Sequence, residues 1–263
     1  MYRGRTSREV ARRVAQALRA DACPEDTAFD RFLPRDLREV SEQYWTPLRV
    51  VKRAAEWFAE LRIRTVLDIG SGAGKFCVAG ALLTDARFIG LEHRSSLVES
   101  ARALAKTFGV SRRVTFVHGA LGAVATPHAE AYYLYNPFGD YWFDSSRDNS
   151  DPEVTFNHAR REVDIAAVER LIRLSPVGTT VLTYNSFGGR MPECCDLVHL
   201  EWALPGPLRL WRKQRDTADA RGSRPLSYLR DVTGVDRGTG QALDRLQSPL
   251  KTDGPRGTSV NNK

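Results

Sequence analysis

The sequence predicts an α/β fold: a doubly wound, mostly parallel sheet with an antiparallel terminal strand. Two observations lead to this prediction. Short apolar segments at 65–69, 87–92, 113–117 and 131–135 alternate with helical patterns, which is typical of βαβ units in a parallel sheet. A turn with three glycines (Gly70, Gly72 and Gly74) directly follows the first of these strands, where open α/β sheets bind ligands.

Length and composition divide the chain into three expected parts. With 263 residues, 42% of them hydrophobic, it can form one large domain with tails. We expect an N-terminal helical extension over 1–43, a ligand-binding α/β domain over 44–215, and a disordered C-terminal tail over 216–263, where apolar periodicity is lost.

The segment before the first strand is expected to be largely helical. Apolar residues recur every fourth position over 8–20, which predicts an amphipathic helix. A loop containing Pro24 and Pro34 is expected next. Thr46 and Pro47 are then expected as the N-cap and the first residue of a helix that leads into the strand at 65–69.

The remaining elements follow from the same patterns. Helices are expected over 76–83, over 96–108, and in a long segment that ends near 174. Three further strands are expected at 179–184, 197–203 and 207–212.

Charge and cysteine usage restrict the classes of partner. The net charge is +7, and residues 1–20 carry six arginines and one glutamate (6 − 1 = +5). We therefore expect weak nucleic-acid contact through this basic N-terminus; such a start is also typical of a mitochondrial transit peptide, but the amphipathic pattern favours a surface helix. No apolar run is long enough to span a membrane. The cysteines form no CxxC pair, so we expect no metal site and a cytoplasmic protein; they are Cys23, Cys77, Cys194 and Cys195.

Two phosphate-binding patterns do not fit the glycine turn. A P-loop fails at both anchors, because Ile69 stands where its first glycine should be and Phe76 replaces the Ser or Thr. The dinucleotide fingerprint needs its third glycine at the position of Lys75, where a long side chain would impair helix–strand packing. An NAD-dependent oxidoreductase is therefore disfavoured.

The pattern that does fit is D-x-G-x-G-x-G, filled by Asp68, Gly70, Gly72 and Gly74. It resembles motif I of the class I S-adenosylmethionine (SAM)-dependent methyltransferases, and the resemblance covers roughly residues 46–212. It implies a Rossmann-like methyltransferase fold, SAM as cofactor, and 44–215 as the SAM-binding domain. Within the turn, the backbone of the three glycines and Ser71 is expected to approach the cofactor.

Two acids at predicted strand ends agree with a cationic nucleoside ligand. Asp68 places a negative charge where it can bind an ammonium or sulfonium group. Glu92 lies 22 residues after the first glycine (92 − 70), where a carboxylate can accept hydrogen bonds from ribose hydroxyls. Many relatives carry a third acid beside the adenine; here Gly119 and Ala120 occupy that region, and their backbone is expected to meet the adenine edge.

The end of the fourth strand suggests what accepts the methyl group. Asn136-Pro137-Phe138 resembles the N/D-P-P-Y/F motif of amine-methylating members, without the second proline. The resemblance implies that the Asn136 amide and the Pro137 carbonyl hold an acceptor nitrogen and that the Phe138 ring stacks on a flat acceptor. We therefore predict methyl transfer to nitrogen. Alternation along the strand should bury some of the aromatic residues of this region in the core and leave the rest to line an acceptor pocket or to enclose a methylated ammonium. These aromatic residues are Tyr132, Tyr133, Tyr135, Phe138, Tyr141, Trp142 and Phe143.

The acceptor itself stays open. Tyr44-Trp45-Thr46-Pro47, followed by the glycine turn and Gly90-Leu91-Glu92, is similar to the lysine-methylating group related to Dot1, in which an upstream Thr-containing loop covers the cofactor. This similarity implies that Thr46 contacts SAM. A protein lysine, a small amine and RNA remain candidate acceptors. The alternative is a non-catalytic SAM- or nucleoside-binding module or partner subunit, which the incomplete acceptor motif would suit.

Overall fold

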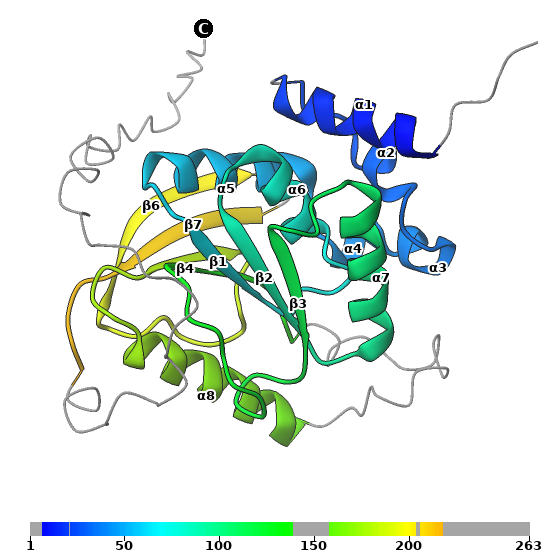
Figure 1. The fold of residues 1–263 in the computed structure, drawn as a ribbon. Coiled ribbons are helices and arrows are strands. Elements are labelled where there is room, and N and C mark those ends of the chain that lie inside the picture. The colour runs from blue at the N-terminus through cyan, green and yellow to red at the C-terminus, as the bar shows by residue number, and fades with distance from the viewer. Residues whose placement is uncertain (1–6, 21, 139–157, 204–205, 218–263) are drawn as a thin grey trace, which may run out of the picture.

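The computed structural model describes residues 7–20, 22–138, 158–203 and 206–217, and these form helices around one seven-stranded sheet (Figure 1). Of the tail predicted over 216–263, all residues after 217 therefore lie outside the described residues. The strands are β1 (Thr65–Ile69), β2 (Arg87–Glu92), β3 (Val114–His118), β4 (Ala131–Tyr135), β5 (Thr180–Tyr184), β6 (Cys195–Ala203) and β7 (Gly206–Lys213). The helices are α1 (Ser7–Arg19), α2 (Asp26–Asp30), α3 (Arg35–Glu39), α4 (Ser41–Tyr44), α5 (Leu48–Glu60), α6 (Lys75–Leu83), α7 (Ser95–Thr107) and α8 (His158–Leu174).

The sheet has the doubly wound order that the sequence predicts. Its strands follow the order β3-β2-β1-β4-β5-β7-β6, with β1 to β5 parallel and β7 antiparallel to both of its neighbours. The chain moves outward from β1 through β2 to β3, then returns to the other side of β1 as β4. The carboxyl ends of β1 and β4 therefore form the switch point, where ligands bind in such sheets.

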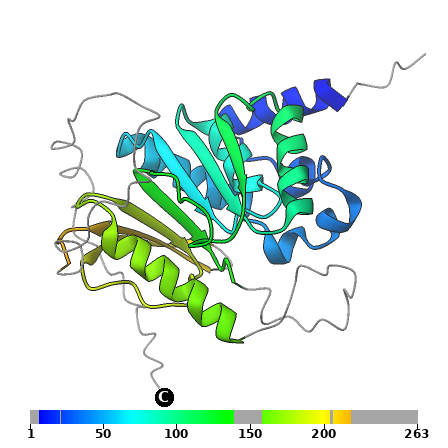
Figure 2. The same ribbon diagram turned by 60° about the horizontal axis from the view of Figure 1, so that its bottom comes forward.

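Helices cover both faces of the sheet (Figures 1 and 2). On one face α1, α5, α6 and α7 pack into a large core cluster that includes Trp57, Phe76 and Tyr133. On the other face α8 contributes Val168 and Ile172 to a second cluster. Burial on both faces explains why β1, β4 and β5 read as nearly continuous apolar runs.

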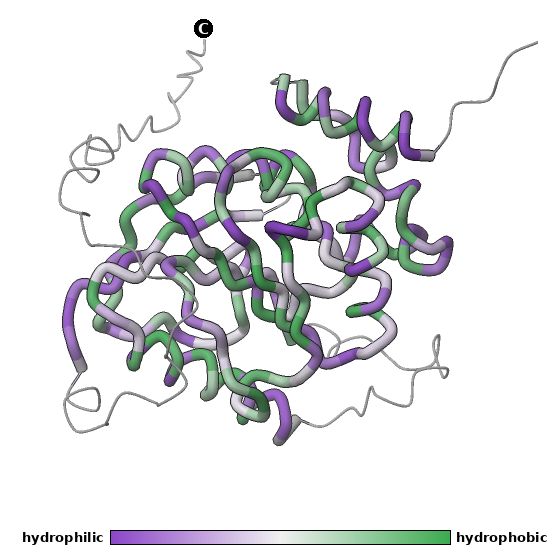
Figure 3. The backbone as a smooth tube through the Cα atoms, in the orientation of Figure 1, coloured by the Kyte–Doolittle hydropathy of each residue, from purple (hydrophilic) through white to green (hydrophobic). Residues whose placement is uncertain are grey.

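The N-terminal helix α1 is amphipathic, as predicted. Val14 and Leu18 are buried, whereas Arg12 and Arg13 are exposed, and the helix shows alternating hydrophobic and hydrophilic bands in Figure 3. The Arg19 Nε donates to the Leu82 carbonyl of α6 over 3.0 Å. The described part of the 1–43 segment thus shares the large core cluster with the following domain. None of the helices in the described ranges is long and apolar enough to cross a bilayer.

Two expectations about the segment before β1 are wrong. The stretch expected as a loop forms the short helices α2, α3 and α4. Pro34 is the N-cap of α3, so it precedes a helix start and does not interrupt a helix. Helix α5 begins at Leu48 with Pro47 as its N-cap, one residue later than predicted. The Leu48 N–H donates to Asp26 Oδ1 over 2.9 Å, so a side chain distant in sequence caps this helix.

Candidate functional site

The glycine turn lies at the switch point and has a backbone that favours glycine throughout. Gly70, Gly72 and Gly74 have φ values of +76°, +52° and +78°. These left-handed values are costly for residues with a side chain. The N–H groups of Gly70 and Ser71 both donate to the Leu91 carbonyl, over 2.9 and 3.0 Å, which holds the turn against β2.

Neighbouring segments also approach all three of these glycines too closely for a side chain. A Cβ at Gly70 would come within 2.7 Å of the Pro137 Cβ and 3.3 Å of its carbonyl oxygen. A Cβ at Gly72 would overlap the ring of Trp45. The turn therefore contacts both the predicted acceptor segment at the end of β4 and the segment that precedes α5.

Asp68 is a buried acid directly before the turn. Its side chain is on β1, the residue is 3% exposed, and its Oδ2 accepts from the Cys77 thiol over 3.4 Å. Burial raises the pKa of Asp68 to about 7; the Cys77 hydrogen bond opposes this rise, and the charge of Glu92 adds to it. A carboxylate kept in such surroundings is suited to a cationic ligand, which would favour its ionised form.

Glu92 connects the end of β2 to the turn. Its Oε2 accepts from the Gly72 N–H and its Oε1 from the Arg94 N–H, both over 2.9 Å. Burial alone would raise the pKa of Glu92, but the hydrogen bond and charge of His93, together with Arg94, hold it below its usual value. Oε1 also lies 3.2 Å from His93 Nδ1, whereas Oε2 accepts from the Gly72 N–H and has a second lone pair, so acceptance from a ribose hydroxyl stays a prediction for Oε2.

The predicted adenine-side backbone lies next to Glu92. The Gly119 N–H donates to the Glu92 carbonyl over 2.9 Å, and the Ala120 carbonyl accepts from the N–H groups of Ala123 and Val124. Both Gly119 and Ala120 are partly exposed. They lie at the carboxyl end of β3, beside the acid that is predicted to bind the ribose.

A small pocket, partly open to solvent, lies beside the turn. The Thr46 hydroxyl and the Tyr133 hydroxyl share a 2.9 Å hydrogen bond at its wall. The buried Ser71 Oγ has no hydrogen-bond partner among the described residues, so it is available to a polar ligand. The lining residues are Tyr44, Trp45, Thr46, Asp68, Gly70, Ser71, Lys75, Phe76, Tyr133 and Tyr135.

The acceptor motif is divided between two environments. Asn136 is exposed, has a φ of +39°, and its N–H donates to the Ser186 carbonyl over 2.8 Å. Pro137 packs on Gly70, beside the pocket. Phe138 is 9% exposed and belongs to the second core cluster, so its ring is not part of the pocket wall.

Alternation along β4 separates its tyrosines, as expected. Tyr132 faces the second cluster, where the Ser175 hydroxyl donates to it over 3.1 Å. Tyr133 faces the other way and stacks on Phe76, with ring centroids 3.5 Å apart. Tyr135 lies on the same face as Tyr133 and reaches the pocket. The other aromatic residues expected near the acceptor lie outside the described residues: Tyr141, Trp142 and Phe143.

Sequence reasoning missed what surrounds Lys75. This lysine lines the pocket and pairs with Asp26 and Asp30, two acids in the segment that was expected to be a loop. The four-residue spacing of these acids, which places them on one face of a helix, was the signal that could have identified them. The two prolines on either side concealed the helix.

No family model matches this chain, and no curated protein matches it. Among solved structures, it is similar to an RNA methyltransferase from Salinibacter ruber in complex with S-adenosyl-L-homocysteine, with 22% identity and a TM-score of 0.49 over 66% of this chain and 96% of that chain. It is also similar to the mitomycin 7-O-methyltransferase MmcR, with 16% identity and a TM-score of 0.47 over 75% of this chain and 60% of that chain. At these values the fold assignment rests on the strand order and pairing described above.

Proposed function

We propose that this chain is a SAM-dependent methyltransferase that transfers a methyl group to a nitrogen acceptor. One observation carries the proposal: the buried carboxylate of Asp68 lines a pocket beside a left-handed glycine turn at the switch point of the sheet. A buried acid in that place suits a ligand with positive charge. SAM has an ammonium and a sulfonium, whereas phosphate ligands would be repelled.

The residues present fit the proposed cofactor. Asp68 would pair with its positive charge, and the Ser71 hydroxyl would bind its polar tail. Glu92 would accept from the ribose, and the backbone of Gly119 and Ala120 would meet the adenine. When bound, SAM supplies an activated methyl group on a sulfonium.

The chain's own contribution to transfer is to orient the acceptor and to exclude water. Thr46 and the stacked pair Phe76 and Tyr133 form a largely buried wall beside the turn. Asn136 and the Pro137 carbonyl, next to Gly70, would accept from the acceptor nitrogen and direct its lone pair. A neutral amine needs no strong base, which agrees with the absence of a predicted catalytic acid or base from this set.

The similar structures and the segment before α5 guide the choice of acceptors to test. The two similar proteins are an RNA methyltransferase and an O-methyltransferase, so RNA and hydroxyl compounds belong in the assay. Tyr44, Trp45 and Thr46 border the pocket, and they belong to the segment whose similarity to the Dot1-related group stays a proposal. Protein lysine and small amines therefore belong in the assay as well.

Calorimetry with SAM, S-adenosylhomocysteine and NAD tests the cofactor. We expect both sulfur nucleosides to bind and NAD not to bind. A labelled-methyl assay over pools of protein, RNA and metabolites tests the reaction. If neither SAM nor S-adenosylhomocysteine binds at millimolar concentration, the proposal is overturned.

The burial of Phe138 favours one alternative, a SAM-binding subunit without catalysis. Its ring lies in the second core cluster, so it does not offer the stacking surface that the amine-methylating motif implies. Tight SAM binding with no transfer to any pool, even when lysate proteins are added as partners, would support this alternative.

A further inference from the structure

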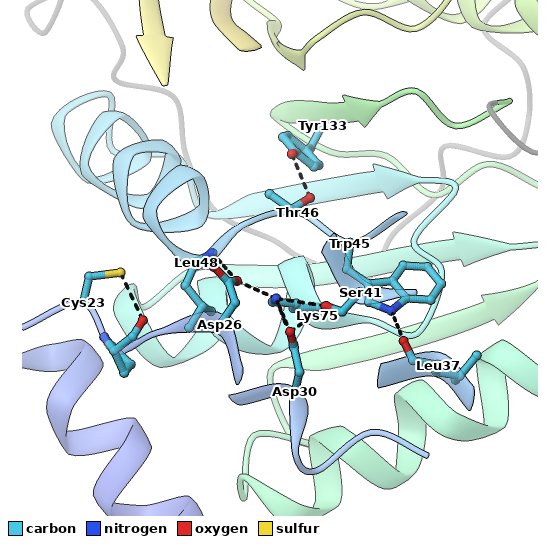
Figure 4. Close-up of polar contacts among 11 residues, drawn as sticks. Cys23, Asp26, Asp30, Leu37, Ser41, Trp45, Thr46, Leu48, Lys75 and Tyr133 are labelled. Atoms are coloured by element: carbon cyan, nitrogen blue, oxygen red, sulfur yellow. Dashed lines mark hydrogen bonds and ion pairs between the residues drawn. The ribbon is translucent and has the colours of Figure 1, made fainter. Parts of the chain in front are cut away.

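Lys75 occupies an unusual position for a lysine (Figure 4). It is the first residue of α6, directly after Gly74, and it is 2% exposed. Its Nζ lies 2.5 Å from Asp26 Oδ1, 2.8 Å from Asp30 Oδ1 and 3.5 Å from Ser41 Oγ. A buried lysine is tolerated only with such compensation, and here all of it comes from the segment before α5.

The two acids hold both ends of the short segment Tyr44–Thr46. On one side, the Ser41 hydroxyl donates to Asp30 Oδ2 over 2.5 Å, three residues before Tyr44. On the other side, the Leu48 N–H donates to Asp26 Oδ1 over 2.9 Å, two residues after Thr46. Lys75 therefore tethers both flanks of this segment to the helix that starts from the glycine turn.

The tethered segment forms part of the pocket wall. The Trp45 ring packs against Gly72, and its Nε1 donates to the Leu37 carbonyl over 2.9 Å. Thr46 bonds Tyr133, which stacks on Phe76 of the same helix as Lys75. The position of Tyr44–Thr46 relative to the turn is thus fixed at its flanks by charge and in its middle by packing.

Stability alone does not account for this arrangement. Buried ion pairs contribute little net stability compared with apolar residues of similar volume, although losing one partner is costly. The chain has another buried lysine, Lys213, whose Nζ donates to the carbonyls of Arg173 and Ser175 at the end of α8. That lysine closes a helix end away from the pocket, whereas Lys75 joins the turn to the segment that covers it.

We propose that Lys75 is a positioning residue for the cofactor pocket: through Asp26 and Asp30 it holds Tyr44–Thr46 against the glycine turn. This inference rests on the proposed function, because it assumes that the pocket binds SAM or its product. Without the ion pairs, Trp45 and Thr46 would no longer be held at one distance from Asp68 and Ser71. Binding would weaken even in a protein that remains folded.

The test measures S-adenosylhomocysteine affinity by calorimetry in three variants of the full chain. Lys75→Met removes the charge, Asp26→Asn keeps an oxygen for the Leu48 N–H but removes one acid, and Lys213→Met is the control lysine. We expect the affinity for S-adenosylhomocysteine to fall about tenfold in Lys75→Met, to fall less in Asp26→Asn, and to stay unchanged in Lys213→Met. Both lysine variants should nevertheless be less stable than the unmodified protein in urea.

A variant without the buried Lys75–Asp30 pair, called here the charge-free variant because it has no charge at these two buried positions, keeps the test valid if Lys75→Met does not fold. Lys75→Met combined with Asp30→Leu leaves no unpaired charge in the core, so its stability should recover while its affinity stays about tenfold weaker. Affinity equal to that of Lys213→Met in the charge-free variant would overturn the inference. If the unmodified protein binds neither SAM nor S-adenosylhomocysteine, the proposed function fails instead, and the two failures are distinct.

Discussion

The carboxylate of Glu92 accepts a hydrogen bond from the Gly72 N–H over 2.9 Å, which joins the end of β2 to the glycine turn after β1. The same carboxylate accepts from the Arg94 N–H at the start of α7. One acid thus orders the backbone of the turn that borders the pocket. A ribose that binds Glu92 would contact an acid whose position is already fixed by two backbone donors.

Glu92→Gln should weaken S-adenosylhomocysteine binding by about tenfold, because an amide cannot accept from two N–H groups with both of its ends. Glu130→Gln is a matched control. Its carboxylate accepts from the N–H groups of Arg64 and Thr65 at the opposite end of β1. Calorimetry on both variants decides the question, and equal affinities would contradict a role for Glu92 in binding.

The lowered pKa of Glu92 adds a pH dependence of stability. An acid with a lowered folded-state pKa stabilises the folded protein above its unfolded value of 4.5, and this contribution is lost as the pH falls through the folded-state pKa. We expect the difference in unfolding free energy between the unmodified protein and Glu92→Gln to shrink below about pH 4.5. Urea titrations at pH 7 and at pH 3.5 measure it.

The ionisation of Asp68 should change the stability of the folded protein with pH in the opposite direction. Its folded-state pKa of about 7 lies above its ordinary value of 3.8, so the unfolded chain binds fewer protons between these values and stability falls as the pH rises through this window. Asp68→Asn removes this loss and should be more stable than the unmodified protein at pH 8. Thermal unfolding without ligand at pH 5 and pH 8 checks the sign.

The same substitution should impair binding. SAM is cationic and should bind the ionised form of Asp68, so affinity should increase between pH 6 and pH 8 in the unmodified protein and less so in Asp68→Asn. We expect at least about tenfold weaker binding for Asp68→Asn at pH 8. Unchanged affinity in this more stable variant would argue against the proposed cofactor site.

Gly72→Ala tests the contact between the turn and Trp45. The added Cβ would overlap the Trp45 ring at a residue with a φ of +52°. Gly109→Ala is the control, since Gly109 has a φ of +72° but no atom within 4 Å of the Cβ position. Both should lose about 1 kcal/mol from backbone strain, but only Gly72→Ala should displace Trp45 and weaken S-adenosylhomocysteine binding in calorimetry. Equal effects on affinity would refute this contact as a determinant of the pocket.

Tyr133→Phe and Tyr132→Phe should show which face of β4 contributes to cofactor binding. Tyr133→Phe removes the hydrogen bond with Thr46 and should cost about 1 kcal/mol of stability together with affinity for the cofactor. Tyr132→Phe removes a comparable hydrogen bond with Ser175 on the opposite face and should cost stability alone. Loss of affinity in both variants would indicate a general effect of destabilisation.

The sheet and the glycine turn could be predicted from local sequence patterns. Local patterns were sufficient to predict the strands, since the strands are buried on both faces of the sheet and consecutive residues such as Val66 and Leu67 are apolar. The glycines of the turn are required by backbone angles that other residues avoid. The places of Asp68 and Glu92 at strand ends followed directly. Parallel strands bring their carboxyl ends to one edge, so these acids had to lie near the turn.

The wall of the pocket, in contrast, depends on contacts between segments that are far apart in the sequence. Lys75 was considered from sequence as an obstacle to helix–strand packing, yet its side chain is buried against Asp26 and Asp30, more than forty residues earlier. The side chain that caps α5 is Asp26 rather than Thr46, and Phe138 joins the core rather than the pocket. These outcomes depend on contacts between segments that are distant in sequence. A local pattern does not predict the energies of such contacts, because burial and ion pairing arise only when the segments pack.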